Sequence, residues 1–223
     1  MVLVSVAAVA IGLAVVAVAL PKAAPRDELR MPPTAYDSAL VNGSVLGSPA
    51  APVTIQLYAD FQCPACRLFV TTELPRLTDE FVKPGTVRIE THDIAFLGKG
   101  SFDESLELAV GAACAADQGR YWPFHDIVFW NQGRENQGDH DAAFIAQVAD
   151  QAMVDRPTWD ACVAADQHRD AVKAGTRQAV GAGISSTPTL VVNGERVVGV
   201  PDYDTLASLI RRQAGEPASP AAS

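Results

Sequence analysis

The feature that most constrains this chain is a pair of cysteines placed where a strand gives way to a helix. Residues 53–59 alternate apolar and polar side chains, which is typical of a half-buried strand. Cys63 and Cys66 follow at once, and from Pro64 to Val82 apolar residues recur at helical spacing. Pro64 suits the first helical position, where its missing N–H costs nothing. The chain therefore presents a Cys-x-x-Cys pair in the first turn of a helix.

A second β-prone run at residues 86–91 completes a β-α-β unit with the first strand. Such a unit predicts parallel pairing and a right-handed crossover, and Pro75 should kink the intervening helix. Residues 101–181 then change character, because no convincing strand interrupts a series of helical patterns. These patterns cover residues 104–118, 122–131, 141–153, 158–166 and 169–180, with a polar loop at 131–139 and a helix cap at Asp139 or Asp141. The sequence thus predicts an all-helical insertion in an α/β frame.

The strand pattern returns after Thr187 and Pro188. Two β-branched runs flank Asn193-Gly194, which predicts a hairpin with a type I′ turn. A last amphipathic helix begins near Pro201, and residues 215–223 form a tail rich in Pro, Ala and Ser that we expect to be disordered.

The N-terminus carries an uncharged apolar run, Val2 to Leu20. As a helix it would cover about 28 Å, close to the thickness of a bilayer core. We expect residues 1–20 to be a signal anchor, with a cleaved signal peptide as the alternative. The basic residues that follow argue mildly against a domain outside the cytoplasm. Residues 21–50 are predicted to be a linker with a short leading strand within 37–46, and residues 51–214 the folded domain.

Composition narrows the class of protein further. The net charge is −9 and the Lys and Arg residues are scattered, so we expect no nucleic-acid partner. The four cysteines, an even number, allow three pairings. Exported chains keep disulfides and cytosolic chains rarely do, so the cysteine count and the apolar leader together indicate an extracytoplasmic domain.

Taken together, this layout resembles the DsbA family of thiol–disulfide oxidoreductases, a thioredoxin fold with an all-helical insertion, in its membrane-tethered bacterial branch. The resemblance covers residues 51–214. It is carried by the segments Asp60 to Cys66 (DFQCPAC), Gln118 to Asp126 (QGRYWPFHD) and Ser186 to Gly194 (STPTLVVNG).

The resemblance implies a redox role for the cysteine pair. A helix N-terminus favours a thiolate, so Cys63 is predicted to be the exposed nucleophile and Cys66 the more buried resolving thiol. Pro64, Ala65 and Asp60 are the candidate modulators of that thiolate, and Asp60 is equally compatible with a solvated surface carboxylate. No cofactor is expected beyond the Cys63–Cys66 disulfide. A metal site is not expected, because Cys-x-x-Cys supplies only two of four zinc ligands.

Two further residue pairs acquire roles from the resemblance. Pro188 is expected to be a cis-proline beside the cysteines, where Thr187 and Pro188 would bind substrate peptide; a plain proline at a strand start is the alternative. Cys114 and Cys162 are expected to form a structural disulfide, with two separate buried thiols as the alternative.

The chain also departs from the family pattern. Ala65 stands where DsbA has a histidine, and Leu57 stands where thioredoxin and DsbA carry a buried acid; Glu90 on the next strand is a candidate substitute for that acid. The four histidines have no metal-like spacing, and His125 is interpreted as a packed helix residue.

We therefore expect a monomeric enzyme that introduces disulfides into reduced or unfolded exported proteins. A quinone-linked membrane partner would reoxidise it. A reductase or isomerase of the same fold is one alternative, and a non-redox peptide-binding or chaperone module is another.

Overall fold

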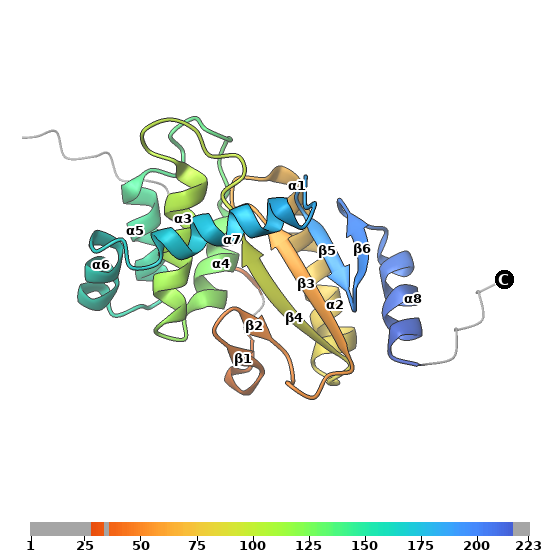
Figure 1. Cartoon of the computed structure of the whole chain (residues 1–223). Helices are drawn as coiled ribbons and strands as arrows, with labels where there is room; N and C mark the ends of the chain where they lie inside the picture. Colours follow the sequence, from red (N-terminus) through yellow and green to blue (C-terminus); the bar gives the residue numbers. More distant parts are fainter. Residues whose placement is uncertain (1–27, 34–35, 216–223) are drawn as a thin grey trace, which may run out of the picture.

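A six-stranded sheet lies at the centre of the protein (Figure 1). The computed structural model describes residues 28–33 and 36–215, and the strand order is β1-β2-β4-β3-β5-β6. The strands are β1 (Val41–Asn42), β2 (Val45–Leu46), β3 (Val53–Ala59), β4 (Val87–Asp93), β5 (Thr189–Val192) and β6 (Glu195–Val198). Only β3 and β4 pair in parallel; every other pair is antiparallel. The predicted β-α-β unit is confirmed.

The helix after the cysteines is continuous but not uniform. It runs as α1 (Pro64–Leu68), a π-helical turn (Phe69–Glu73), α2 (Leu74–Leu77) and a second π-helical turn (Thr78–Val82). Pro75, where a kink was predicted, lies in the first turn of α2, directly after the first π-helical turn. Proline has no N–H to donate to the helical hydrogen bonds there.

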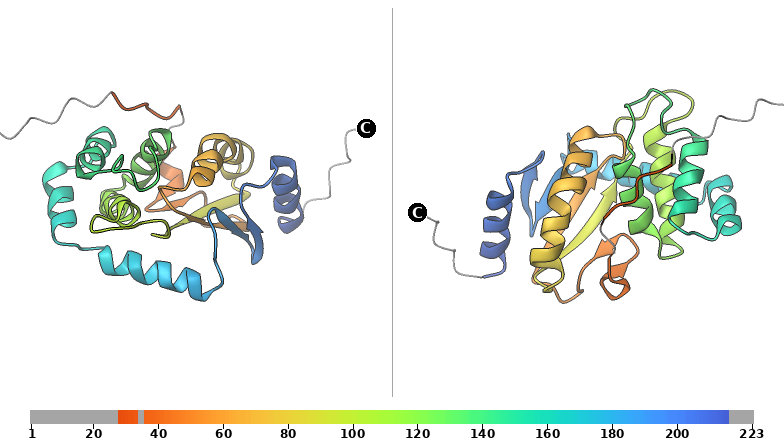
Figure 2. Two further views of the ribbon diagram at one scale, coloured as in Figure 1. Left: turned by 90° about the horizontal axis from the view of Figure 1, so that it is seen from above. Right: turned by 180° about the vertical axis from the view of Figure 1, so that it is seen from behind.

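The five predicted helices of the insertion are all present. They are α3 (Glu104–Ala116), α4 (Tyr121–Trp130), α5 (Ala142–Gln151), α6 (Arg156–Ala164) and α7 (Arg169–Gly181). Asp141 is the cap, since its Oδ1 accepts a hydrogen bond from the N–H of Phe144 at 2.9 Å. α3 to α6 form a bundle beside the sheet, and α7 returns across the sheet face opposite α1 and α2 (Figure 2).

The C-terminal hairpin and the last helix also match the prediction. Asn193 and Gly194 both have positive φ, 44° and 93°, as a type I′ turn requires. α8 (Tyr203–Gln213) is capped by Asp202 and packs beside α2, where Arg76 lies 3.5 Å from the centre of the Tyr203 ring.

The short leading strand predicted within residues 37–46 is present, as the two strands β1 and β2, but the linker predicted for residues 21–50 is wrong over this part. β1 and β2 form a hairpin that pairs with β4, and Leu46 is fully buried opposite Ile89. Asn42-Gly43-Ser44 is a hairpin turn in which Gly43 adopts a φ of 58°. The hairpin extends the sheet beyond β4, so the folded domain begins before residue 51. The expected anchor (1–20) and nearly all of the expected tail lie outside the described residues. Within residues 28–33 and 36–215, no helix combines the length and apolarity needed to cross a membrane.

Candidate active site

The two cysteines lie at the carboxyl end of β3, where the chain enters α1. Cys63 is the N-cap residue of α1 and Cys66 belongs to its first turn. Both are free thiols. Cys66 is fully buried and Cys63 is 7% exposed, so Cys66 is the more buried of the two, as predicted. The prediction that Cys63 is exposed is wrong, because Cys63 is buried as well.

The surroundings separate the two thiols chemically. A hydrogen bond from Cys66 lowers the pKa of Cys63 to about 6, and the N–H groups of Cys66 and Ala65 at the helix start act in the same direction against burial. Burial raises the pKa of Cys66 well above its ordinary value, and the neighbouring Cys63 sulfur adds to that effect. At neutral pH the reduced pair is therefore a thiolate at Cys63 and a thiol at Cys66.

The start of β5 forms the other wall of the site. The Thr187–Pro188 peptide bond is cis. In its thiol form Cys63 donates a hydrogen bond from Sγ to the carbonyl oxygen of Thr187 at 3.3 Å. Pro188 is buried and Thr187 is half-buried. Antiparallel pairing of β3 with β5 brings these residues to the cysteines.

Asp60 is a buried structural carboxylate, so its interpretation as a solvated group is wrong. Its Oδ1 accepts from the N–H of Gln62 and the hydroxyl of Ser105, both at 2.8 Å. Its Oδ2 accepts from the N–H groups of Phe96 and Leu97 at 2.7 and 2.9 Å. Burial raises the pKa of Asp60, and these hydrogen bonds oppose the rise. Asp60 thus ties the loop before Cys63 to α3 and to the loop after β4.

The polar loop between α4 and α5 also holds the segment before α1 in place through hydrogen bonds. Gln132 Nε2 donates to the carbonyl oxygens of Phe61 and Cys63 at 2.7 and 3.1 Å. Gln62 Oε1 accepts from the N–H of Asn136 at 2.7 Å. The sequence analysis missed these amides because a glutamine in a polar loop carries no local signal of its partner.

The proposed substitute acid, Glu90, does not contribute as expected. Glu90 pairs in register with Gln56, so its side chain lies on the sheet face opposite that of the buried Leu57. Its carboxylate contacts Arg88 Nη2 at 2.9 Å. Glu90 therefore does not replace the missing acid. His125 is fully buried, with Nδ1 2.7 Å from Asp126 Oδ1, which agrees with its interpretation as a packed helix residue.

The remaining two cysteines join α3 to α6. Cys114 and Cys162 form a disulfide with a Cα–Cα distance of 5.9 Å, and both are buried. This bond lies in the helical bundle, away from the Cys63–Cys66 pair.

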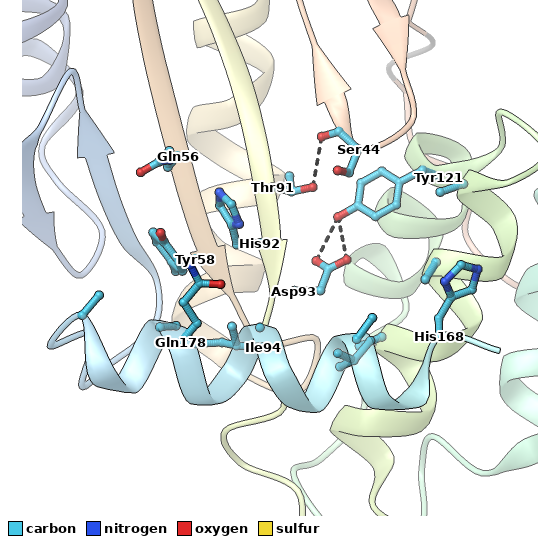
Figure 3. Close-up of a pocket in the computed structure, with 18 of the residues that line it drawn as sticks. Ser44, Gln56, Tyr58, Thr91, His92, Asp93, Ile94, Tyr121, His168 and Gln178 are labelled. Carbon is cyan, nitrogen blue, oxygen red and sulfur yellow. Dashed lines mark hydrogen bonds between the residues drawn. The ribbon is translucent and has the colours of Figure 1, made fainter. Parts of the chain in front are cut away.

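A cavity lies between the sheet and α7 (Figure 3). Tyr58 stacks on His92 there, and the hydroxyl of Tyr121 donates to both carboxylate oxygens of Asp93 at 2.9 Å. Burial raises the pKa of Asp93 to about 6. None of the predicted redox or peptide-binding residues lines this cavity.

Comparison with known proteins agrees with this geometry. A family model described as thioredoxin matches residues 39–212. The probable disulfide bond formation protein D of Bacillus anthracis is 27% identical over 171 residues, which cover 75% of this chain and 76% of that protein. BdbD from Bacillus subtilis, solved in its oxidised form, has a TM-score of 0.71 at 22% identity and covers 78% of this chain and 94% of its own. Oxidised DsbA from Mycobacterium tuberculosis has a TM-score of 0.65 at 25% identity and covers 79% and 92%.

The predicted fold, a thioredoxin fold with a helical insertion, is confirmed by the sheet order, the bundle and these structural neighbours. The resemblance to DsbA-like thiol–disulfide oxidoreductases is confirmed as well. The chain belongs to the thioredoxin family, as a DsbA-like thiol–disulfide oxidoreductase whose central fold is interrupted by a helical insertion.

Proposed function

We propose that this protein is an extracytoplasmic disulfide oxidase that transfers the Cys63–Cys66 disulfide to pairs of thiols in exported proteins. The observation that carries the proposal is the contrast between the two sulfurs: the pKa of Cys63 is lowered to about 6 and that of Cys66 is raised. A stabilised thiolate at Cys63 favours the reduced form of the enzyme, which makes its disulfide more oxidising. Enzymes of this family use such a cysteine pair and no external cofactor.

The reaction consists of two exchange steps. A substrate thiolate attacks the Cys63 sulfur, the Cys63–Cys66 bond breaks, and Cys66 leaves as a thiolate that takes up a proton. The second substrate thiolate then attacks the substrate sulfur of the mixed disulfide, and Cys63 leaves. The substrate loses two electrons and the enzyme gains them. The low pKa of Cys63 makes it a good leaving group in the second step.

Substrate binding is assigned to Thr187 and Pro188. Pro188 has no N–H, and the backbone of half-buried Thr187 lies beside Cys63. A substrate peptide in extended form can pair with the backbone at Thr187 and present its own cysteine to the Cys63 sulfur. Pro64 and Ala65 shape the same rim: Pro64 starts α1, and Ala65 contributes its backbone N–H to the Cys63 thiolate.

The oxidase needs a partner that removes the electrons it collects. We propose a quinone-linked membrane protein for this step, and we propose that residues 1–20 hold a monomeric domain outside the cytoplasm. Reduction of intact cells with a membrane-impermeant phosphine, followed by labelling with a membrane-impermeant maleimide, tests the location, because Cys63 should be modified only if the domain lies outside. The N-terminal sequence of the purified protein distinguishes an anchor from a cleaved signal.

Equilibration in defined mixtures of reduced and oxidised glutathione tests the direction. We expect an oxidising midpoint, close to the glutathione couple or above it; a midpoint near that of thioredoxin, about −270 mV, would overturn the oxidase proposal in favour of a reductase. Oxidation of a reduced, unfolded substrate should be abolished by Cys63→Ser. The non-redox peptide-binding alternative is correct under two conditions. The Cys63→Ser variant must keep full activity in a substrate-binding or aggregation assay, and that activity must account for the role of the protein in cells.

A further inference from the structure

The Cys114–Cys162 disulfide has a histidine and a carboxylate beside it. One donor atom each of Cys114, Cys162 and His168 lies within 4.8 Å of the others. Asp117 Oδ2 is 2.7 Å from His168 Nε2 and 4.0 Å from Cys162 Sγ. Both cysteines are buried, and His168 lies at the start of α7, at the edge of the cavity in Figure 3. Three groups that bind metals therefore converge where α3, α6 and α7 meet, and the carboxylate of Asp117 is hydrogen-bonded to one of them, His168.

The four residues fall into two short pairs in the chain. Asp117 follows Cys114 by three positions, and His168 follows Cys162 by six. Zinc sites are commonly built from such pairs of closely spaced ligands. The ligand distances of tetrahedral zinc place neighbouring donor atoms about 3.3–3.8 Å apart, so the separations among Cys114, Cys162 and His168 need only small side-chain movements. The Cα atoms of the two cysteines are already 5.9 Å apart.

The backbone around the cluster is held in place without the disulfide. Asp166 turns the chain after α6 with a φ of 52°, and the N–H of Gln167 donates to the carbonyl oxygen of Cys162 at 3.2 Å. Arg169 then binds both carboxylate oxygens of Glu107 on α3 at 2.9 Å. This bidentate pair fixes the start of α7 against α3, so His168 stays close to Cys114 and Cys162 when the sulfurs separate.

We propose that reduction of the Cys114–Cys162 disulfide creates a tetrahedral Zn²⁺ site with Cys114, Cys162, His168 and Asp117 as ligands. A dithiol reductant supplies two electrons and two protons, which convert the disulfide into two thiols. Zn²⁺ then displaces the two thiol protons and occupies the place of the hydrogen bond between His168 and Asp117. The metal links α3, α6 and α7 in the reduced protein as the disulfide links α3 to α6 in the oxidised one.

Cobalt binding tests the proposal in the full chain carrying Cys63→Ser and Cys66→Ser, so that the redox pair contributes no ligand. The protein is reduced with a phosphine, freed of the reductant without air, and titrated with Co²⁺ and then Zn²⁺. We expect one Co²⁺ per chain with thiolate charge-transfer bands and a tetrahedral ligand-field spectrum, full displacement by Zn²⁺, and a Zn²⁺-dependent rise in Tm. The oxidised protein should show none of these.

Ligand variants of the same background complete the test. His168→Ala and Asp117→Asn should each weaken Co²⁺ binding at least about tenfold, because even the loss of an outer-shell partner of a metal ligand costs about 10- to 100-fold. His168→Ala should also change the spectrum. His92→Ala and Asp170→Asn are the matched controls and should leave the affinity unchanged. The proposal fails if His168→Ala binds Co²⁺ with the same affinity and spectrum, or if the oxidised protein binds equally well. It also fails if the reduced protein unfolds and Zn²⁺ does not restore its structure.

Discussion

The sulfur of Cys63 lies 3.3 Å from the carbonyl oxygen of Thr187, a residue 124 positions later in the chain. Neither residue defines a redox site alone. Antiparallel pairing of β3 with β5, with Tyr58 opposite Thr189, carries the Thr187–Pro188 peptide to the helix start that holds the thiolate. The nucleophile and the proposed peptide-binding backbone are thus brought together by one strand pair.

The first prediction concerns the ionisation of Cys63. Thiolate absorbance of the reduced protein should titrate with a midpoint at about pH 6, the pKa lowered mainly by the hydrogen bond from Cys66. Cys66→Ala removes that hydrogen bond and should raise the midpoint by at least about one unit. The oxidised protein is the blank for the absorbance. A wild-type midpoint near 9 would show that the helix start does not stabilise the thiolate.

The second prediction concerns the pH dependence of stability. The pKa of Cys63 is about 6 in the folded reduced protein, below its ordinary value of 9.0, so the thiolate stabilises the reduced fold above about pH 9. That contribution is lost as the pH falls through 6. The oxidised protein has no thiol at Cys63, and other groups titrate in both forms. The Tm of the reduced form relative to the oxidised form should therefore fall between about pH 8 and pH 5. The Tm of Cys63→Ala, measured against the same oxidised wild-type protein, should show no such fall.

The third prediction concerns Ala65, which supplies only its backbone N–H to the thiolate. Ala65→His places an imidazole near Cys63, and its cationic form should lower the pKa of Cys63 by about one unit. The glutathione midpoint should become more oxidising in parallel, because a more stable thiolate is a better leaving group. Ala65→Gln enlarges the side chain without adding a charge, so the pKa of Cys63 and the glutathione midpoint should both stay unchanged. Equal shifts in the two variants would rule out an electrostatic effect.

The fourth prediction concerns Asp60. Asp60→Asn replaces an acceptor of four hydrogen bonds by an amide whose NH₂ group faces buried donors. The free energy of unfolding of the oxidised protein should fall by about 2–4 kcal/mol, measured in urea. Ser105→Ala removes one of the four partners and should cost about 1 kcal/mol. A loss below about 0.5 kcal/mol for Asp60→Asn would contradict a structural role.

The fifth prediction separates the two cysteine pairs. The double variant Cys114→Ser/Cys162→Ser opens a cross-link between residues 48 positions apart, which the chain-entropy model values at about 4 kcal/mol. We expect a loss of about 2–4 kcal/mol in the free energy of unfolding. The glutathione midpoint of Cys63–Cys66 at a temperature where the variant is folded should not change. A shift in that midpoint would show that the two sites are coupled.

Local patterns in the sequence determined much of this protein. The alternation in residues 53–59, the helical spacing after Pro64 and the Asn193-Gly194 turn each depend on residues close together in the chain, so the elements and the Cys-x-x-Cys position were predictable. The turn at Gly43 was missed because the strands beside it are two residues long, too short to show a period.

Only the tertiary structure decided what surrounds the cysteines. The burial of Asp60 depends on donors from residues 96, 97 and 105, and Gln132 reaches the active-site loop from the far end of α4. Glu90 was excluded as the substitute acid by strand register, which sets the face on which its side chain lies. Hydrogen bonds and burial join residues distant in sequence, and a single sequence carries no record of which distant groups will meet.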